Sequence, residues 1–274
     1  MKTRKWLAYP YLVWMVGFIV VPLILIVYYG LTSAGGGITL DNIALISKPI
    51  NRGALWLSLE LSFISTIVCL VLAYPLALIL RNLKIKSSSF VVLVFILPMW
   101  MNSLLRTLAW QNILENTGIL NQILSFFNLP TLSIINTPSA IMIGMVYNFL
   151  PFMILPIYNS LVKISDDIVN AAKDLGANNF QTFIRVIWPL SFPGVVSGVI
   201  MVFVPSLTTF AISDILGGSK VLLIGNVIEQ QFKIVNNWHT GSGLSLVLMV
   251  FILISMAILA KYDKNENKAG GQII

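Results

Sequence analysis

The sequence predicts an all-α polytopic membrane protein that crosses the bilayer six times. Apolar residues make up 57% of the chain and charged residues 10%, whereas a soluble domain carries about 25% charged residues. The apolar residues are also gathered into long segments, and a helix needs about 20 of them to cross the hydrocarbon layer. We therefore expect one transmembrane domain over residues 1–274, with no separate soluble domain.

Six segments are long and apolar enough to span the membrane: residues 9–31, 55–80, 89–110, 138–161, 189–212 and 243–261. The first follows a basic N-terminus but lacks a small-residue cleavage site, so we expect an uncleaved span rather than a signal peptide. Prolines inside the spans predict kinked helices in a packed bundle, where neighbouring helices satisfy the freed carbonyls. A polar tail, residues 262–274, follows the last span.

The distribution of basic residues predicts that both termini are cytoplasmic. With that orientation, twelve of the 17 Lys and Arg residues lie in inside segments, three in each segment. Cytoplasmic loops carry such an excess. The ten acids divide evenly between the two sides, so the net charge of +7 is a topology signal. It does not indicate nucleic acid as a partner.

The segment 163–194 is the longest polar passage between spans, and it predicts two short helices joined at a glycine. Ser165 is a candidate N-cap of the first helix, and Gly176 stands where a left-handed residue would end it. Asn178 and Gln181 have the spacing of a capping box for the second helix. By these features alone, the segment could be bound by a soluble partner, or it could lie as an amphipathic helix on the bilayer surface.

The spacing within this segment resembles the cytoplasmic coupling loop of ABC-type import permeases, Glu-Ala-Ala, three residues, Gly, nine residues, Ile-x-Leu-Pro. The chain departs at Asn170, where the family has Glu, and at Trp188, where it has Leu. The resemblance implies the type I importer permease fold, with residues 163–188 as a coupling loop that docks on a separate ATPase dimer. That ATPase would bind ATP and Mg. The implied coupling residues are Asn170, Ala171, Ala172, Asp174, Gly176 and Pro189.

The chain lacks the residue sets of an enzyme or a metal site. It has no phosphate-binding loop pattern, no metalloprotease motif, no pair of cysteines and no Ser-His-Asp candidate set. We expect Cys69 to be a packing residue and His239 to be a solvated residue of an outer loop. ATP hydrolysis, if it drives transport, must therefore take place in another subunit, and we expect no cofactor in this chain.

Ionisable residues in or near spans are candidates for a transport pathway, because burying charge in lipid is costly. Glu60 lies in the second predicted span and Asp214 at the end of the fifth. For both, a substrate role and solvation at the interface remain open, whereas we expect Arg81 and Arg106 to snorkel from span ends. Carboxylates with aromatic faces would suit a flexible organic cation. The aromatic candidates at similar depth are Trp56, Trp100, Trp110, Tyr147 and Phe210.

Three further segments resemble the spermidine/putrescine import permeases: Leu104–Leu114, Phe183–Gly198 and Ser213–Phe232. This resemblance implies a polyamine importer of the bacterial cytoplasmic membrane. Its partners would be a second permease, an ATPase dimer and an extracellular polyamine-binding protein. Two alternatives stay open: the same architecture serving an amino acid, an oxyanion or iron, and a self-contained channel or secondary transporter.

Overall fold

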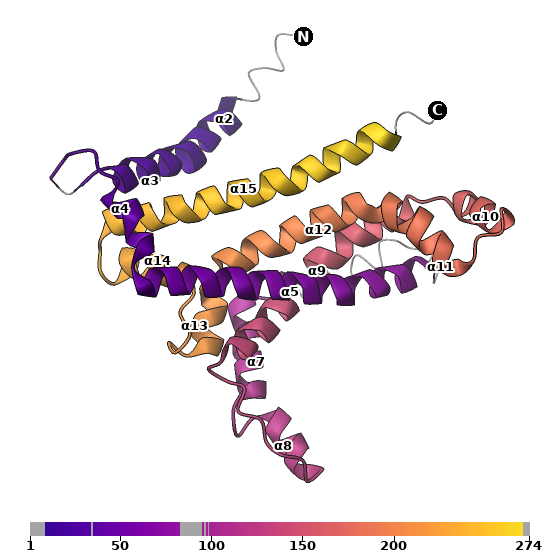
Figure 1. Cartoon of the computed structure of the whole chain (residues 1–274). Coiled ribbons are helices and arrows are strands. Elements are labelled where there is room, and N and C mark those ends of the chain that lie inside the picture. The colour runs from indigo at the N-terminus through magenta and orange to yellow at the C-terminus, as the bar shows by residue number, and fades with distance from the viewer. Residues whose placement is uncertain (1–8, 34, 83–94, 96, 98, 271–274) are drawn as a thin grey trace. The chain divides into compact units, whose positions relative to one another are not determined.

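A computed structural model describes residues 9–33, 35–82, 95, 97 and 99–270, and its long elements are all helices (Figure 1). The chain forms two compact units. The first comprises the residues up to Leu55 together with Val227–Ile254, and the second comprises Trp56–Asn226 together with the residues from Ser255 onward.

The first unit contains the N-terminal helices and parts of the C-terminal ones. Its elements are α2 (Tyr9–Met15), η1 (Val16–Val20), α3 (Val21–Leu31), α4 (Asp41–Ala44), η2 (Leu45–Ser47), and parts of α14 (Ile224–Lys233) and α15 (Trp238–Gly270). His239, expected to be a solvated residue of an outer loop, is half-buried and stands in the first turn of α15. Its Nδ1 lies 2.6 Å from the carbonyl oxygen of Thr32 and 3.1 Å from that of Tyr29, because the last carbonyls of α3 have no partner within their own helix.

The second unit contains the remaining helices and the polar segment. Its elements are most of α5 (Pro49–Asn82), then α7 (Ser103–Leu114), α8 (Ile119–Phe126), α9 (Pro138–Val162), α10 (Asp166–Asp174), α11 (Asn179–Thr182), η3 (Phe183–Ile187), α12 (Trp188–Thr208) and α13 (Ala211–Gly217).

Small residues allow α12 to pack closely against α9. A Cβ atom at Gly194 would lie 2.5 Å from Ser160 Cβ and 2.6 Å from the carbonyl oxygen of Pro156. Helices in membranes associate through such small-residue contacts, because lipid leaves little hydrophobic force between them. Helix α5 joins the same core cluster through residues such as Cys69 and Ala73, both fully buried. Cys69 is thus a packing residue, as expected.

Five of the helical segments in the described part of the chain are long and apolar enough to cross a membrane: Pro10–Leu31, Pro49–Asn82, Pro138–Val162, Asn179–Thr208 and Trp238–Ile258. They correspond to five of the six predicted spans. The remaining one, residues 89–110, falls largely outside the described residues, and its last part belongs to α7.

Two of the predicted segments differ in extent from the helices. The fifth span begins in α11 and ends at Thr208, so residues 211–212 belong to α13 and not to the span. The predicted polar tail also begins as helix, since α15 continues to Gly270, while residues 271–274 lie outside the described residues.

Two of the predicted irregularities at prolines take the form of single π-helical turns. Turn η1 ends two residues before Pro22, and η3 ends two residues before Pro189. Proline cannot donate to the carbonyl four residues earlier, and its ring clashes with that carbonyl. A wider turn displaces the carbonyl, and such turns are frequent at functional sites. The second of them connects the polar segment to a membrane span.

Candidate functional site: the coupling segment and the polar groups of the helices

The predicted glycine turn of the polar segment is confirmed. Gly176 follows α10 with a φ of +88°. The Ala177 amide donates to the Ala172 carbonyl at 3.1 Å, and the Gly176 amide donates to the Lys173 carbonyl at 2.8 Å. This pair of bonds is a Schellman motif, which requires a left-handed residue at its centre. The Schellman motif therefore fixes the spacing of four residues between Ala172 and Gly176.

The second helix of the segment begins as predicted. The Gln181 amide donates to the Asn178 side chain at 2.8 Å, and the Asn178 amide donates to the Gln181 side chain at 3.0 Å, which completes the capping box. Ser165 occupies the N-cap position of α10 with extended backbone, but its side chain makes no capping hydrogen bond there. In Figure 1, α10 and α11 lie together at one end of α12.

The end of α5 is bonded to the start of the polar segment. Arg81 Nη2 donates to the carbonyl oxygen of Ile164 at 3.0 Å and lies 3.6 Å from Asp166 Oδ1. The expectation that Arg81 snorkels is therefore wrong. Its side chain is only 10% exposed, because the carbonyl and the carboxylate compensate the guanidinium within the fold. Arg81 and Asp166 line a polar pocket of 490 Å³, together with Asn170 and Lys173.

The end of the polar segment is held by aromatic residues. The Tyr74 hydroxyl lies 2.7 Å from Ser191 Oγ, which in turn donates to the Trp188 carbonyl at 3.1 Å. The Tyr74 ring contacts the rings of Phe183 and Trp188, with centroids 5.7 Å and 5.1 Å apart. Trp188, which stands where the resembling family has Leu, therefore contributes to the junction between η3 and α12. Pro189 follows directly in the first turn of α12.

The outer surface of the segment combines polar and apolar side chains. Asn170, Ala171 and Asp174 are exposed and Ala172 is half-buried. Leu175 is 90% exposed and Phe180 is 70% exposed, on either side of the Gly176 turn. Large apolar side chains exposed beside a turn of fixed geometry form a surface that a partner can bind.

Glu60 lies in an apolar pocket. It lines a volume of 520 Å³ together with Trp56, Leu59, Phe63 and, from α12, Phe203. Glu60, Trp56 and Phe63 share one exposed face of α5, while the opposite face packs into the core. The predicted combination of a carboxylate with aromatic side chains is present here. Trp56 is one of the aromatic candidates named from the sequence, whereas Phe63 and Phe203 are not.

Two of the other aromatic candidates form a different group. The rings of Trp110 and Tyr147 lie 5.2 Å apart, and the guanidinium carbon of Arg106 lies 6.0 Å from the Tyr147 centroid. Arg106 is buried with 8% exposure, so the expectation that it snorkels is also wrong. Tyr147 therefore already contacts a cation of its own chain. Trp100 is 77% exposed, just before the N-cap of α7.

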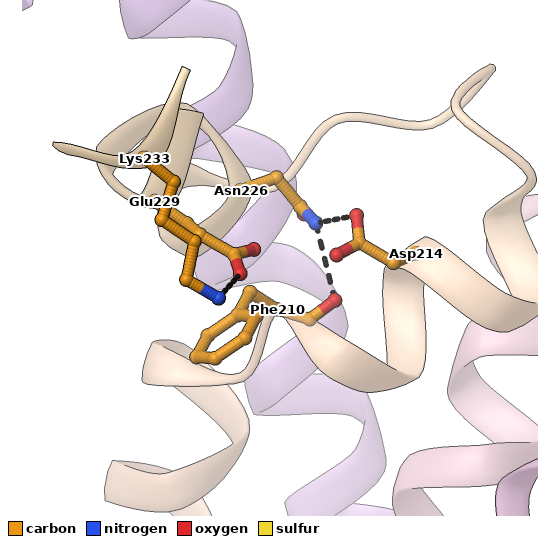
Figure 2. A network of polar contacts seen from close by, with 5 residues as sticks. All are labelled: Phe210, Asp214, Asn226, Glu229 and Lys233. Atoms are coloured by element: carbon orange, nitrogen blue, oxygen red, sulfur yellow. Dashed lines mark hydrogen bonds and ion pairs between the residues drawn. The ribbon is translucent and has the colours of Figure 1, made fainter. Parts of the chain in front are cut away.

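Asp214 and Phe210 belong to a third group, centred on Asn226 (Figure 2). The Asn226 amide nitrogen donates to the Asp214 carboxylate and to the Phe210 carbonyl. Its carbonyl oxygen accepts from Ser213 Oγ and from the Leu223 amide. Asn226 is 1% exposed and uses its full bonding capacity. The Asp214 carboxylate thus takes part in holding the loop that follows α13.

The predicted pathway residues other than Trp100 are therefore divided among three groups. Glu229 of α14 is paired with Lys233 Nζ of the same helix at 2.6 Å (Figure 2). Sequence reasoning missed Asn226, Tyr74 and Ser191. Asn226 carried a signal, because it is an amide inside an apolar run, whereas Tyr74 and Ser191 are ordinary span residues whose bond joins positions far apart in the chain.

Comparisons with known proteins agree with this architecture. Residues 70–265 match the family of binding-protein-dependent transport system inner membrane components. The spermidine/putrescine transport system permease protein PotB of Haemophilus influenzae is 38% identical, over 92% of this chain and 91% of that protein. PotB of Escherichia coli K12 is also 38% identical, over 84% of each chain.

A solved structure shares the fold. A chain from the crystal structure of a bacterial ABC transporter involved in the import of the acidic polysaccharide alginate superposes with a TM-score of 0.78, covering 96% of each chain at 17% identity. That likeness supports the fold and not the substrate. The family match covers most of the chain, and the two PotB proteins are each 38% identical to it over 84–92% of its length. This multi-pass membrane protein therefore belongs to the binding-protein-dependent ABC transport permeases.

Proposed function

We propose that this chain is the permease subunit of an ATP-driven importer of polyamines, with spermidine and putrescine as the substrate class. The observation that carries the proposal is its identity of 38% to the PotB permeases over 84–92% of the chain. The chain contributes half of the translocation pathway. The other half comes from a second permease, and ATP is hydrolysed by a partner ATPase dimer that binds ATP and Mg.

The Glu60 pocket supports a cationic substrate. An acidic side chain in a span costs up to about 2.5–3.5 kcal/mol in lipid, the value at the centre of a helix. We therefore expect the face of α5 that carries Glu60 to face a pathway or a protein. Polyamines are flexible chains of ammonium groups. A carboxylate attracts them by charge, and each aromatic ring face adds about 0.5–2 kcal/mol of cation–π energy. Trp56 and Phe63 beside Glu60 provide such faces.

The polar segment is the surface that docks on the ATPase. Leu175 and Phe180 flank the Gly176 turn and are exposed. Closure of the ATPase dimer on ATP would move this segment and rock the spans between inward- and outward-facing states. An extracellular polyamine-binding protein delivers the substrate on the opposite side. In this orientation both termini are cytoplasmic, as the basic residues predict.

Uptake of labelled spermidine tests the substrate. The measurement compares cells with and without this gene, in a strain that lacks other polyamine transporters. We expect uptake to require the gene and to be inhibited by excess putrescine, but not by an amino acid or sulfate. Unchanged uptake after deletion, or inhibition by an amino acid or sulfate, would overturn the polyamine assignment.

A matched pair of variants tests the site. Glu60→Gln removes a charge-assisted contact worth about 1.5–3 kcal/mol, so we expect the KM for spermidine to rise at least about tenfold. Glu229→Gln makes the same chemical change in a carboxylate that is already paired with Lys233. It should leave the KM unchanged. Equal effects of the two variants would remove Glu60 from the pathway.

A further inference from the structure

We infer that α5 transmits the movement of the coupling segment to the Glu60 pocket, and that Tyr74, Ser191 and Arg81 are the positioning residues that join it to that segment. The inference rests on the proposed function for the roles of the segment and of Glu60. Helix α5 is one helix of 34 residues, Pro49–Asn82. With a rise of 1.5 Å per residue, Glu60 and Arg81 lie about 31 Å apart along it.

Both ends of the coupling segment, which is the polar segment 163–194, are bonded to this one helix. At the start, Arg81 donates to the Ile164 carbonyl at 3.0 Å, directly before α10. At the end, the Tyr74 hydroxyl bonds Ser191 Oγ at 2.7 Å, where η3 passes into α12. A displacement of the segment by the ATPase therefore acts on α5 at two points. The bond of Tyr74 also spans two different helices, so it changes length whenever α5 and α12 slide past one another.

The two bonds lie on opposite sides of a weak point in α5. Pro75 cannot donate to the carbonyl of Val71, so the helix can bend at this turn. Arg81 lies beyond Pro75, and Tyr74 lies on the same side of it as Glu60. Movement that enters through Arg81 alone must pass this turn, whereas movement through Tyr74 reaches the Glu60 half directly. The Tyr74–Ser191 bond is therefore the more important of the two for coupling.

The environment of this bond makes it persistent. Tyr74 is 6% exposed and Ser191 is fully buried, so water does not compete for either hydroxyl. In Tyr74→Phe the ring keeps its contacts with Phe183 and Trp188, and only the hydroxyl is lost. This variant therefore separates the bond from the packing of the core.

The test measures spermidine uptake and ATP hydrolysis together, in vesicles that hold the complete importer with its binding protein. We expect uptake per ATP hydrolysed to fall about fivefold in Tyr74→Phe and in Ser191→Ala, the size of effect that one hydrogen bond supports. The double variant should fall no further than the larger single change, because both remove the same bond. Arg81→Gln should reduce the ratio less than Tyr74→Phe.

Ser197→Ala is the matched control, since Ser197 Oγ donates to the Pro193 carbonyl at 2.9 Å inside α12. It should keep the wild-type ratio. A wild-type ratio in both Tyr74→Phe and Ser191→Ala, or additive losses in the double variant, would overturn the inference. Failure of the polyamine assignment would appear instead in the wild type, as absent spermidine uptake. The same ratio would then be compared between variants and wild type with the solute that is transported.

Discussion

Replacing Gly176 by valine tests the coupling role of the segment most directly. Gly176 has a φ of +88°, and among the described residues no atom lies within 4 Å of where a Cβ would stand. The cost of a side chain is therefore one of backbone conformation alone. A left-handed conformation costs an ordinary residue about 1–2 kcal/mol, and a β-branched side chain is among the least tolerant of it.

This strain acts on the Schellman turn, because two of its hydrogen bonds join the amides of Gly176 and Ala177 to the last turn of α10. At about 1.4 kcal/mol the turn would lose a factor of about ten in its folded population. Among the described residues beyond its chain neighbours, none has an atom within 4 Å of the new Cβ. We therefore expect Gly176→Val to assemble in the membrane at wild-type amounts, but to hydrolyse ATP with uptake reduced several-fold. Gly176→Asn should be affected less, since Asn tolerates this conformation.

The control is Gly36→Val. Gly36 has a φ of +87° and equally open surroundings, but it lies in a turn between α3 and α4. It carries the same backbone cost outside the coupling segment, so uptake per ATP should stay at the wild-type value. Wild-type uptake in Gly176→Val would refute the coupling role of the turn. A matching loss in Gly36→Val would show that backbone strain anywhere is sufficient.

Three further changes have defined outcomes. Asn178→Ala removes the capping box of α11, at a cost of about 1 kcal/mol, and should lower coupling but not the KM for substrate in the same vesicle assay; an unchanged ratio would contradict this. Gly194→Leu forces a side chain against α9, where even a Cβ would lie 2.5 Å from Ser160 Cβ. We expect a lower Tm of the purified importer in detergent, and an unchanged Tm would show that the contact relaxes. Asn226→Ala removes the acceptor of the buried Leu223 amide and should cost about 1–3 kcal/mol. The cost is measured as a Tm shift, which should be larger than that of Asn178→Ala.

Local sequence features predicted the turns and most of the spans, because their physical causes are local. The capping box needs only Asn178 and Gln181, and the glycine turn needs only a residue without a Cβ at position 176. Span length follows from the thickness of the bilayer. The end of the fifth span was predicted wrongly, since Phe210 and its neighbours are as apolar as the span itself and only the break after Thr208 separates α12 from α13.

The roles of individual polar residues were decided by tertiary contacts. Arg81 and His239 stand at positions that sequence assigns to solvent, yet both bond carbonyls at helix ends distant in the chain. Tyr74 carried no sequence signal, because its partner Ser191 is separated from it by 117 residues.

By itself, the sequence determined that this is a membrane protein with a glycine turn between two short helices, since hydrophobicity and turn chemistry act over a few neighbouring residues. The permease role came from the resemblance of that segment to a family motif. Only the tertiary structure decided which carboxylate stays in an apolar pocket and which is held by the chain. Glu60 and Asp214 are both carboxylates in or at the end of an apolar segment. The structure places Phe203 of α12 beside Glu60, and it places Asn226, which follows the loop after α13, beside Asp214.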